Sequence, residues 1–135
     1  MESFEIGSST DVLLRFHSRL FDDERWIESY DVTLLSQGIE ATVHVENPRY
    51  GHPPSAFFQQ LARSWQAWKP ENDWRAMEAE LYLSATADKL GHITLVAELR
   101  GDFYQPWRAS GEAILEAGQL DSVAFRAGRF FSADL

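Results

Sequence analysis

Three runs of alternating apolar and polar residues between Glu78 and Glu116 are the strongest structural signal in the chain. Apolar side chains recur at every second position, which is the period of a β-strand that buries one face. Two loops that contain glycine separate the runs, so the sequence predicts three consecutive antiparallel strands. The positions predicted to face the core are Met77, Ala79, Leu81, Leu83, Ala85, Ile93, Leu95, Ala97, Leu99, Trp107, Ala109, Gly111, Ala113 and Leu115.

The same alternation predicts four more strands in the first 46 residues. They are a short edge strand at Phe4 and Ile6, a strand from Asp11 to Phe21, a strand from Trp26 to Leu35, and a return strand from Ile39 to Glu46. Gly38 can adopt the positive φ that a tight hairpin between the last two strands requires. The strand phase places Trp26 on the inner face, together with Tyr30, Val32 and Leu34.

The strand from Asp11 to Phe21 also predicts a basic stripe. Its inner face is expected to hold Val12, Leu14, Phe16 and Leu20, which leaves Arg15, His17 and Arg19 together on the outer face. Such a stripe is able to bind an anion or a phosphate. Cross-strand ion pairs explain it more simply, and the acidic partners expected are Asp31, Glu40 and Glu46.

Two segments have helical instead of strand periodicity. After the proline-rich loop 47–54, apolar residues recur at helical spacing as far as Trp68, with Ser55 as the expected N-cap. A second helix is predicted from Gln119 to Phe131. The segment from Glu71 to Arg75 fits either a loop or one turn of helix.

These elements predict a single α+β domain over residues 1–135. The architecture expected is a mainly antiparallel sheet of about seven strands, curved or partly sandwiched. Two amphipathic helices pack on its apolar face.

Composition narrows the function classes. The chain has 12 Lys and Arg against 21 Asp and Glu, a net charge of -9, and such a charge repels nucleic acid and anionic membranes. It has no cysteine, its four histidines lack metal-ligand spacing, and no cofactor motif or catalytic motif occurs, so no metal, no cofactor and no enzymatic activity are expected. No signal peptide or membrane span is evident, which favours a cytoplasmic protein.

Two loops have the residues of a protein interface. Asp22, Asp23 and Glu24 form an acidic tip, and Phe103, Tyr104 and Trp107 belong to an aromatic loop. Aromatic anchors and charges that steer a partner are typical of binding surfaces. The simpler interpretations are a solubilising turn for the tip and a hydrophobic lid over the core for the aromatic loop.

Acidic residues on the strands offer a further site. Glu78 and Glu80, or Glu112 and Glu116, share polar strand faces, and carboxylates are abundant enough for some pair to have the separation of about 5 to 9 Å that a glycosidase requires. Without a pocket or a perturbed pKa, a solvated surface is the better interpretation.

The C-terminal half resembles an uncharacterised family of small bacterial proteins, similar in layout to the Wap-type immunity proteins of polymorphic toxin systems. The resemblance rests on residues 81–88, 91–95 and 116–120, on Trp107, and on the closing Arg129, Phe130 and Phe131. It implies a noncatalytic binding role in a bacterial cytoplasm and supplies no catalytic residue.

Three functions therefore stay open. The leading hypothesis is a noncatalytic protein-binding domain, an immunity protein that occludes a basic toxin domain. The second is a small-ligand-binding or enzymatic domain with an apolar pocket between sheet and helices, lined by Trp65, Trp68, Tyr82 and His52. The third is a homodimeric structural module that uses an exposed sheet edge or face.

Overall fold

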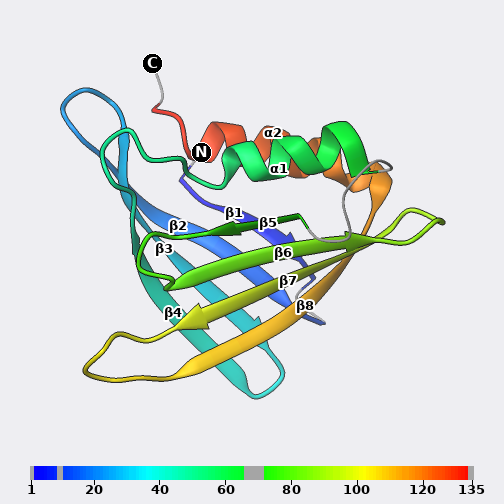
Figure 1. The fold of residues 1–135 in the computed structure, drawn as a ribbon, viewed down its shortest axis with the longest axis horizontal. Helices are drawn as coiled ribbons and strands as arrows, with labels where there is room; N and C mark the ends of the chain where they lie inside the picture. The colour runs from blue at the N-terminus through cyan, green and yellow to red at the C-terminus, as the bar shows by residue number, and fades with distance from the viewer. Residues whose placement is uncertain (1, 9–10, 66–71, 134–135) are drawn as a thin grey trace.

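The computed structural model describes residues 2–8, 11–65 and 72–133 (Figure 1). The strands are β1 (Phe4–Gly7), β2 (Leu13–Phe21), β3 (Ile27–Ser36), β4 (Ile39–Glu46), β5 (Asn72–Arg75), β6 (Leu81–Ala87), β7 (His92–Arg100) and β8 (Arg108–Glu116). Within the described residues they form two antiparallel sheets of four strands, ordered β1-β2-β3-β4 and β5-β6-β7-β8. The α+β class and the antiparallel pairing are confirmed, but eight strands in two sheets replace the predicted seven.

The helices α1 (Ser55–Ser64) and α2 (Leu120–Phe130) lie side by side above the edge strands β1 and β5 (Figure 1). A 3₁₀ turn, Ala117–Gln119, leads into α2 and is closed by a capping box between Glu116 and Gln119. The face of α2 predicted to be apolar is buried, and its residues are Leu120, Val123, Ala124, Ala127 and Phe130.

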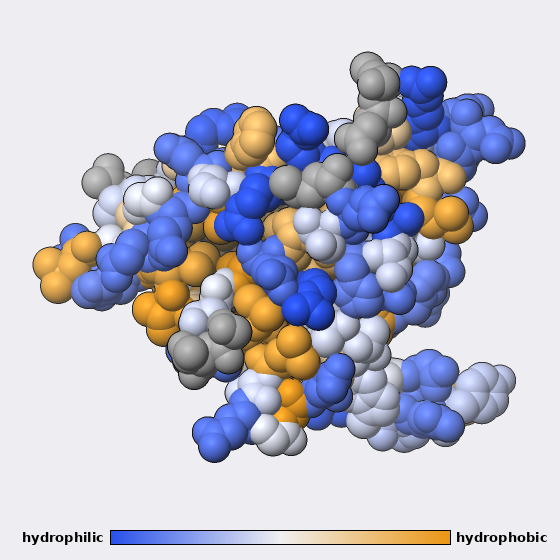
Figure 2. Space-filling view, turned by 180° about the vertical axis from the view of Figure 1, so that it is seen from behind, coloured by the Kyte–Doolittle hydropathy of each residue, from blue (hydrophilic) through white to orange (hydrophobic). Residues whose placement is uncertain are grey.

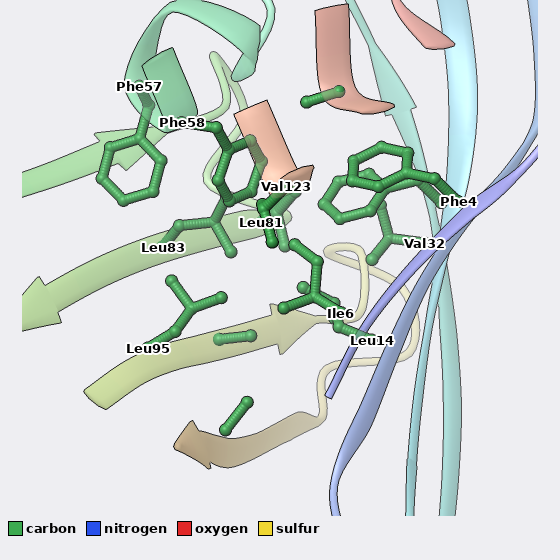
Figure 3. Close-up of a cluster of buried hydrophobic side chains, with 14 of the residues drawn as sticks. Phe4, Ile6, Leu14, Val32, Phe57, Phe58, Leu81, Leu83, Leu95 and Val123 are labelled. Carbon is green, nitrogen blue, oxygen red and sulfur yellow. The ribbon is translucent and has the colours of Figure 1, made fainter. Parts of the chain in front are cut away.

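The core fills the space between the two sheets and the helices (Figure 3). Phe4 of β1 stacks on Phe16 of β2 with ring centroids 4.6 Å apart. Phe58 of α1 meets both rings edge-on, at 6.2 and 6.1 Å. These side chains come from three elements that each contribute one apolar face, so hydrophobic burial joins the helices to the first sheet.

The two sheets approach closely where β8 contains a glycine. A Cβ atom on Gly111 would lie 3.1 Å from Val12 Cγ1 and 3.2 Å from Leu34 Cδ1. Because glycine lacks that atom, β8 packs directly against the first sheet.

A β-bulge in β2 overturns part of the predicted strand phase. Ser18 has a φ of 54°, and the pairing of β2 with β3 shifts between His17 and Leu20. One extra residue exchanges the two faces of a strand. Leu20, predicted to be buried, is therefore exposed, and Arg19, predicted on the outer face, turns toward α2.

Arg19 is consequently not part of the predicted basic stripe, whereas the expected cross-strand ion pairing holds for Arg15 with a different partner. Arg19 donates hydrogen bonds to main-chain carbonyls at the end of α2, and Arg15 pairs with Glu5 of β1 at 2.7 Å. His17 bonds to the hydroxyl of Thr33 at 2.8 Å. Asp31, expected to pair with this stripe, instead contacts His44.

Four residues predicted to face the core lie outside the strands. Met77 and Ala79 belong to a turn before β6, in which Ala79 has a φ of 60° and Met77 is exposed. Trp26 precedes β3, and Ile27 is the buried residue at its start. Trp107, just before β8, is 39% exposed and not part of the buried face.

Two local predictions also change around α1. Ser55 is the first helical residue and Pro54 is the N-cap, so Ser55 does not cap the helix as expected. Asn72–Arg75, within the segment predicted as loop or helical turn, is the strand β5. Trp68 lies outside the described residues.

Candidate functional site

Four chain connections lie along one side of the molecule, at the left in Figure 1, with the β2–β3 loop at the top and the β7–β8 loop at the bottom. They are the β2–β3 loop, the β4–α1 segment, the β5–β6 turn and the β7–β8 loop. We call this region the loop end. It unites the two loops that sequence analysis singled out, because Asp22–Glu24 lie in the first connection and Phe103–Trp107 in the last.

The loop end concentrates exposed aromatic side chains. Among the described residues, six large aromatic side chains are exposed, and five of them belong to these connections: Trp26, Tyr50, Phe103, Tyr104 and Trp107. The sixth, Phe125, lies on α2. Aromatic groups are enriched at protein interfaces because they bury a large area with few rotatable bonds.

The acidic tip is tied to the β4–α1 segment. A carboxylate oxygen of Asp22 accepts the main-chain N–H groups of Glu24 and Trp26, both at 2.9 Å. Glu24 forms an ion pair with Arg49 at 2.9 Å, and the ring of Trp26 meets that of Tyr50 edge-on. The tip is therefore part of an ordered surface with two neighbouring aromatic side chains.

The β7–β8 loop is also internally braced. One oxygen of Asp102 accepts the N–H groups of Tyr104 and Gln105 at 2.9 and 2.8 Å. The indole of Trp107 lies against Gly101, where a Cβ atom would come within 2.4 Å of it. This arrangement leaves Phe103 and Tyr104 outside any core contact, at 91% and 88% exposure. The expectation of a hydrophobic lid is therefore wrong for these two side chains.

Figure 2 shows the molecule from behind, so that the loop end lies at the right. Its surface there is mostly blue and white, with smaller orange patches. The exposed aromatics of this end are thus set among polar side chains, as in the rim and core of a protein interface.

A cleft of about 560 Å³ opens within the loop end, between β4, the β5–β6 turn and the β7–β8 loop. Its lining residues are Thr42, Val43, His44, Glu78, Glu80, Arg100, Gly101, Asp102, Phe103, Gln105 and Trp107. The cleft therefore combines carboxylates with aromatic side chains. Its volume lies within the range of ordinary ligand sites.

Glu80 has the most perturbed carboxyl group of this cleft. Burial raises its pKa, and the neighbouring charges of Glu78 and Glu46 raise it further. Its Oε1 atom is buried and has no hydrogen-bond partner among the described residues. The ionised form is therefore poorly solvated.

Tyr30 carries a second buried polar atom without a partner in the described part of the chain, its hydroxyl oxygen. Burial raises the pKa of Tyr30 well above its ordinary value, and the charge of Glu80 contributes in the same direction. The phenol thus lies within electrostatic reach of the Glu80 carboxylate.

His44 lies on the β4 wall of the cleft and contacts two acidic groups. Its Nδ1 is 2.8 Å from Asp31 and its Nε2 is 3.2 Å from Glu46. The hydrogen bond with Asp31 is the main cause of a raised His44 pKa. Protonation of His44 is thus favoured by residues of the first sheet.

A comparison with models of protein families identifies the family of this chain. The model of a family of unknown function, DUF6228, matches residues 5–134. The chain belongs to this family. No relative among curated proteins matches it.

The three described residues of the predicted apolar pocket, Trp65, Tyr82 and His52, lie in different parts of this DUF6228 domain. Tyr82 lies on the outer face of β6 and donates a hydrogen bond to Asp73 at 3.1 Å. His52 is exposed, and its carbonyl accepts the indole N–H of Trp74. Trp65 lies at the other end of α1, near Gly91.

A larger cleft, of about 730 Å³, lies between β1, β8 and α2 of the DUF6228 domain. Ile6, Leu13 and Val123 give it an apolar wall, and Arg15 and Arg126 stand beside it. Both guanidinium groups bind Glu5: Arg15 its carboxylate and Arg126 its carbonyl oxygen, at 2.7 Å in each case.

No described helix has the length and apolarity that a membrane span needs.

Sequence reasoning had identified Glu78 and Glu80 as a pair, but as part of a solvated strand face. The structure places both in the cleft, with Glu80 in the turn before β6. His44 carried no signal beyond its position on a strand. Its role in the cleft depends on pairing between β3 and β4, which puts Asp31 opposite His44.

Proposed function

We propose that this DUF6228 protein is a noncatalytic protein-binding domain and that the loop end is its binding surface. The observation that carries the proposal is that five exposed aromatic side chains belong to connections on the same side of the fold as the acidic tip. Exposed aromatics with a polar surround are the usual anchors of protein interfaces.

Charge supports a basic partner. The chain carries a net charge of -9, and the loop end includes Asp22, Asp23, Glu24, Glu78 and Asp102. Opposite charge on a partner accelerates association and suppresses wrong partners. Binding to such a partner weakens as salt screens the attraction.

The partner we propose is a basic toxin domain, which the protein occludes as an immunity protein in a bacterial cytoplasm. The resemblance of residues 81–88, 91–95 and 116–120 to Wap-type immunity proteins supports this identity. An immunity protein needs only tight, specific binding, which is compatible with a surface without catalytic residues.

The experiment compares two double variants as baits. Phe103→Ser with Tyr104→Ser removes the anchors of the β7–β8 loop. Leu90→Ser with Phe125→Ser, at positions 81% and 65% exposed outside the loop end, is the matched control. Partners captured from the native host are identified, purified and measured by titration calorimetry at low and high salt.

We expect a basic partner that binds the wild type and the control equally and the loop variant at least about tenfold more weakly, because interface aromatics contribute about 2 kcal/mol or more each. Equal affinity of all three proteins for the partner would refute the assigned surface. Expression of the partner alone then tests the immunity role: growth inhibition relieved by co-expression of this chain supports it, and a harmless partner refutes it.

The cleft between β1, β8 and α2 favours a second candidate, a small-ligand-binding domain. Its apolar wall and two arginines fit an amphipathic anion. A fatty acid such as decanoate is a suitable probe. Perturbed amide resonances of Leu13 and Val123 on titration would support this candidate, and unchanged ones would eliminate it for this class.

A further inference from the structure

The cleft of the loop end is built from two separate connections and the strand β4, which makes it a defined recess. β4 supplies His44, the β5–β6 turn supplies Glu78 and Glu80, and the β7–β8 loop supplies Phe103 and Trp107. The main chain holds these parts in place, because the N–H of Arg100 donates to the carbonyl of Glu80 at 3.0 Å. Gly101 similarly donates to the carbonyl of Trp107 at 2.9 Å.

Glu80, in this recess, forms no ion pair among the described residues, although the charge of His44 acts on its carboxyl group and lowers its pKa. Glu80 has one buried oxygen without a hydrogen-bond partner among the described residues, and the hydroxyl of Tyr30, within its electrostatic reach, also lacks one. A desolvated carboxylate is unfavourable unless a cation or hydrogen-bond donors compensate it. Glu78 adds to the negative potential, since its charge raises the pKa of Glu80.

The cationic groups that line the cleft have other acidic partners. Arg100 Nε is 2.7 Å from the carboxylate of Glu98. His44 lies between Asp31 and Glu46, at 2.8 and 3.2 Å. Their charges are therefore shared with these carboxylates, and the attraction for a further cation at Glu80 persists.

Aromatic side chains also line the cleft. Trp107 and Phe103 both line the cleft, and Trp107 is held in place against Gly101. The faces of aromatic rings attract ammonium and guanidinium groups, with tryptophan the strongest. A carboxylate and an indole that line one recess form a suitable environment for a cation on an apolar stem.

We propose that this cleft receives a cationic side chain, lysine or arginine, of the protein partner, with Glu80 as its counter-ion and Trp107 against its stem. This inference rests on the proposed function and specifies its chemistry. A volume of about 560 Å³ accommodates one long side chain with its flanking main chain. The net charge of -9 agrees with a basic partner.

The test uses short peptides as probes. Acetyl-Gly-Arg-Gly-amide and acetyl-Gly-Lys-Gly-amide are titrated into the ¹⁵N-labelled protein, and acetyl-Gly-citrulline-Gly-amide is the neutral isostere of the first. The Trp107 indole resonance reports occupancy. The proteins compared are the wild type, Glu80→Gln, and Glu112→Gln, which neutralises an exposed carboxylate on β8 as a matched control.

We expect millimolar binding of at least one cationic peptide, with the stronger one identifying the preferred side chain. Glu80→Gln should weaken it at least about tenfold, because a charge-assisted hydrogen bond is lost, while Glu112→Gln leaves it unchanged. The pKa of Glu80, followed by its side-chain carbon shift, should fall when the peptide is bound. The ¹⁵N spectrum of Glu80→Gln shows whether that variant keeps its fold.

Equal binding of the citrulline peptide, unchanged affinity of Glu80→Gln, or no response to either cationic peptide would overturn the inference. These results are separable from failure of the proposed function. A partner that binds Glu80→Gln normally and the Phe103, Tyr104 variant weakly would leave the binding function intact and eliminate the cleft. Peptide binding at the cleft without any protein partner would support the cation site and refute the proposed protein-binding function.

Discussion

Replacing Arg19 with alanine should destabilise the protein substantially, although a simple strand pattern places this residue at the surface. The bulge at Ser18 turns Arg19 toward α2. There, Nη1 donates to the carbonyls of Phe130 at 2.9 Å and Arg129 at 3.1 Å. The last carbonyls of a helix have no partner within the helix, so Arg19 satisfies groups that would otherwise depend on water.

The expected loss follows from three terms. Hydrogen bonds that involve a charged donor contribute about 1.5 to 3 kcal/mol net. The guanidinium also lies 5.1 Å from the ring centroid of Phe21 and 5.7 Å from that of Phe130, which adds about 0.5 to 1 kcal/mol. A cation at a helix C-terminus adds a few tenths more. Because these terms overlap, we expect Arg19→Ala to lower the free energy of unfolding by about 2 to 4 kcal/mol.

Urea denaturation monitored by circular dichroism measures this loss. With a slope of about 2 kcal/mol per molar urea, the midpoint should fall by about 1 to 2 M. Arg129→Ala, at an exposed position of α2, is the matched control and should change stability by less than about 0.5 kcal/mol. Arg19→Lys should be intermediate, because an ammonium keeps the charge but loses the planar donor array.

Two results would refute this reasoning. One is an Arg19→Ala protein within about 0.5 kcal/mol of wild type. The other is an equal loss in Arg129→Ala, which would show a general charge effect at this helix end. Hydrogen exchange adds a local check, since the amide of Phe131, which donates to the carbonyl of Ala127, should exchange faster in Arg19→Ala.

The remaining predictions concern the core and the cleft. Leu95 is 2% exposed between the sheets, and Leu95→Ala should lower the free energy of unfolding by about 2 to 5 kcal/mol in the same urea assay. The control Leu90→Ala, in the β6–β7 loop, should lower it by less than about 0.5 kcal/mol. An unchanged urea midpoint for Leu95→Ala would contradict the strand phase. The pKa of His44, titrated by NMR, should lie above its ordinary value of 6.5 and fall toward it in Asp31→Asn. Because the folded pKa is raised, the stabilisation from His44 is fully present below the unfolded pKa and is lost as pH rises through the folded pKa. A His44 midpoint at or below 6.5 would disprove the contact with Asp31 in solution.

The parts of the fold that follow from local periodicity were predictable from the sequence. The apolar face of α2 and the inner face of β7 are buried as expected, because nothing interrupts the period within either element. The bulge in β2 was not predictable by this means. Serine is not typical of a positive φ, so the residues around Ser18 give no sign that the phase changes there.

A chance continuation of the alternating apolar pattern explains why Met77 and Ala79 were wrongly predicted to face the core. Met77 and Ala79 continue the alternation of β6, yet the chain turns at Ala79 with a φ of 60°. Four-residue β5 is too short for its period to be distinguished from a turn. The number of strands, and with it the division into two sheets, depends on pairings that no local window contains.

The location of the candidate site follows from strand parity. Successive antiparallel strands are joined at alternate ends of a sheet, so the β5–β6 and β7–β8 connections fall at one end of the second sheet. Which end of the first sheet lies beside them depends on how the two sheets pack. The turn that leads into β6 and carries Glu78 and Glu80 falls at the same end as the β7–β8 loop because β6, β7 and β8 pair antiparallel in sequence order. The sequence therefore identified Phe103 and Tyr104 individually, whereas the cleft required the complete topology. The perturbed carboxyl group of the cleft also depends on tertiary packing, because Glu80 is desolvated where β4 packs beside the β5–β6 turn. The exposure of Phe103 and Tyr104 follows from the local sequence of their loop, whereas the desolvation of Glu80 follows from tertiary packing. The Glu80→Gln variant and the Phe103, Tyr104 double variant therefore test two different contributions to binding at the loop end.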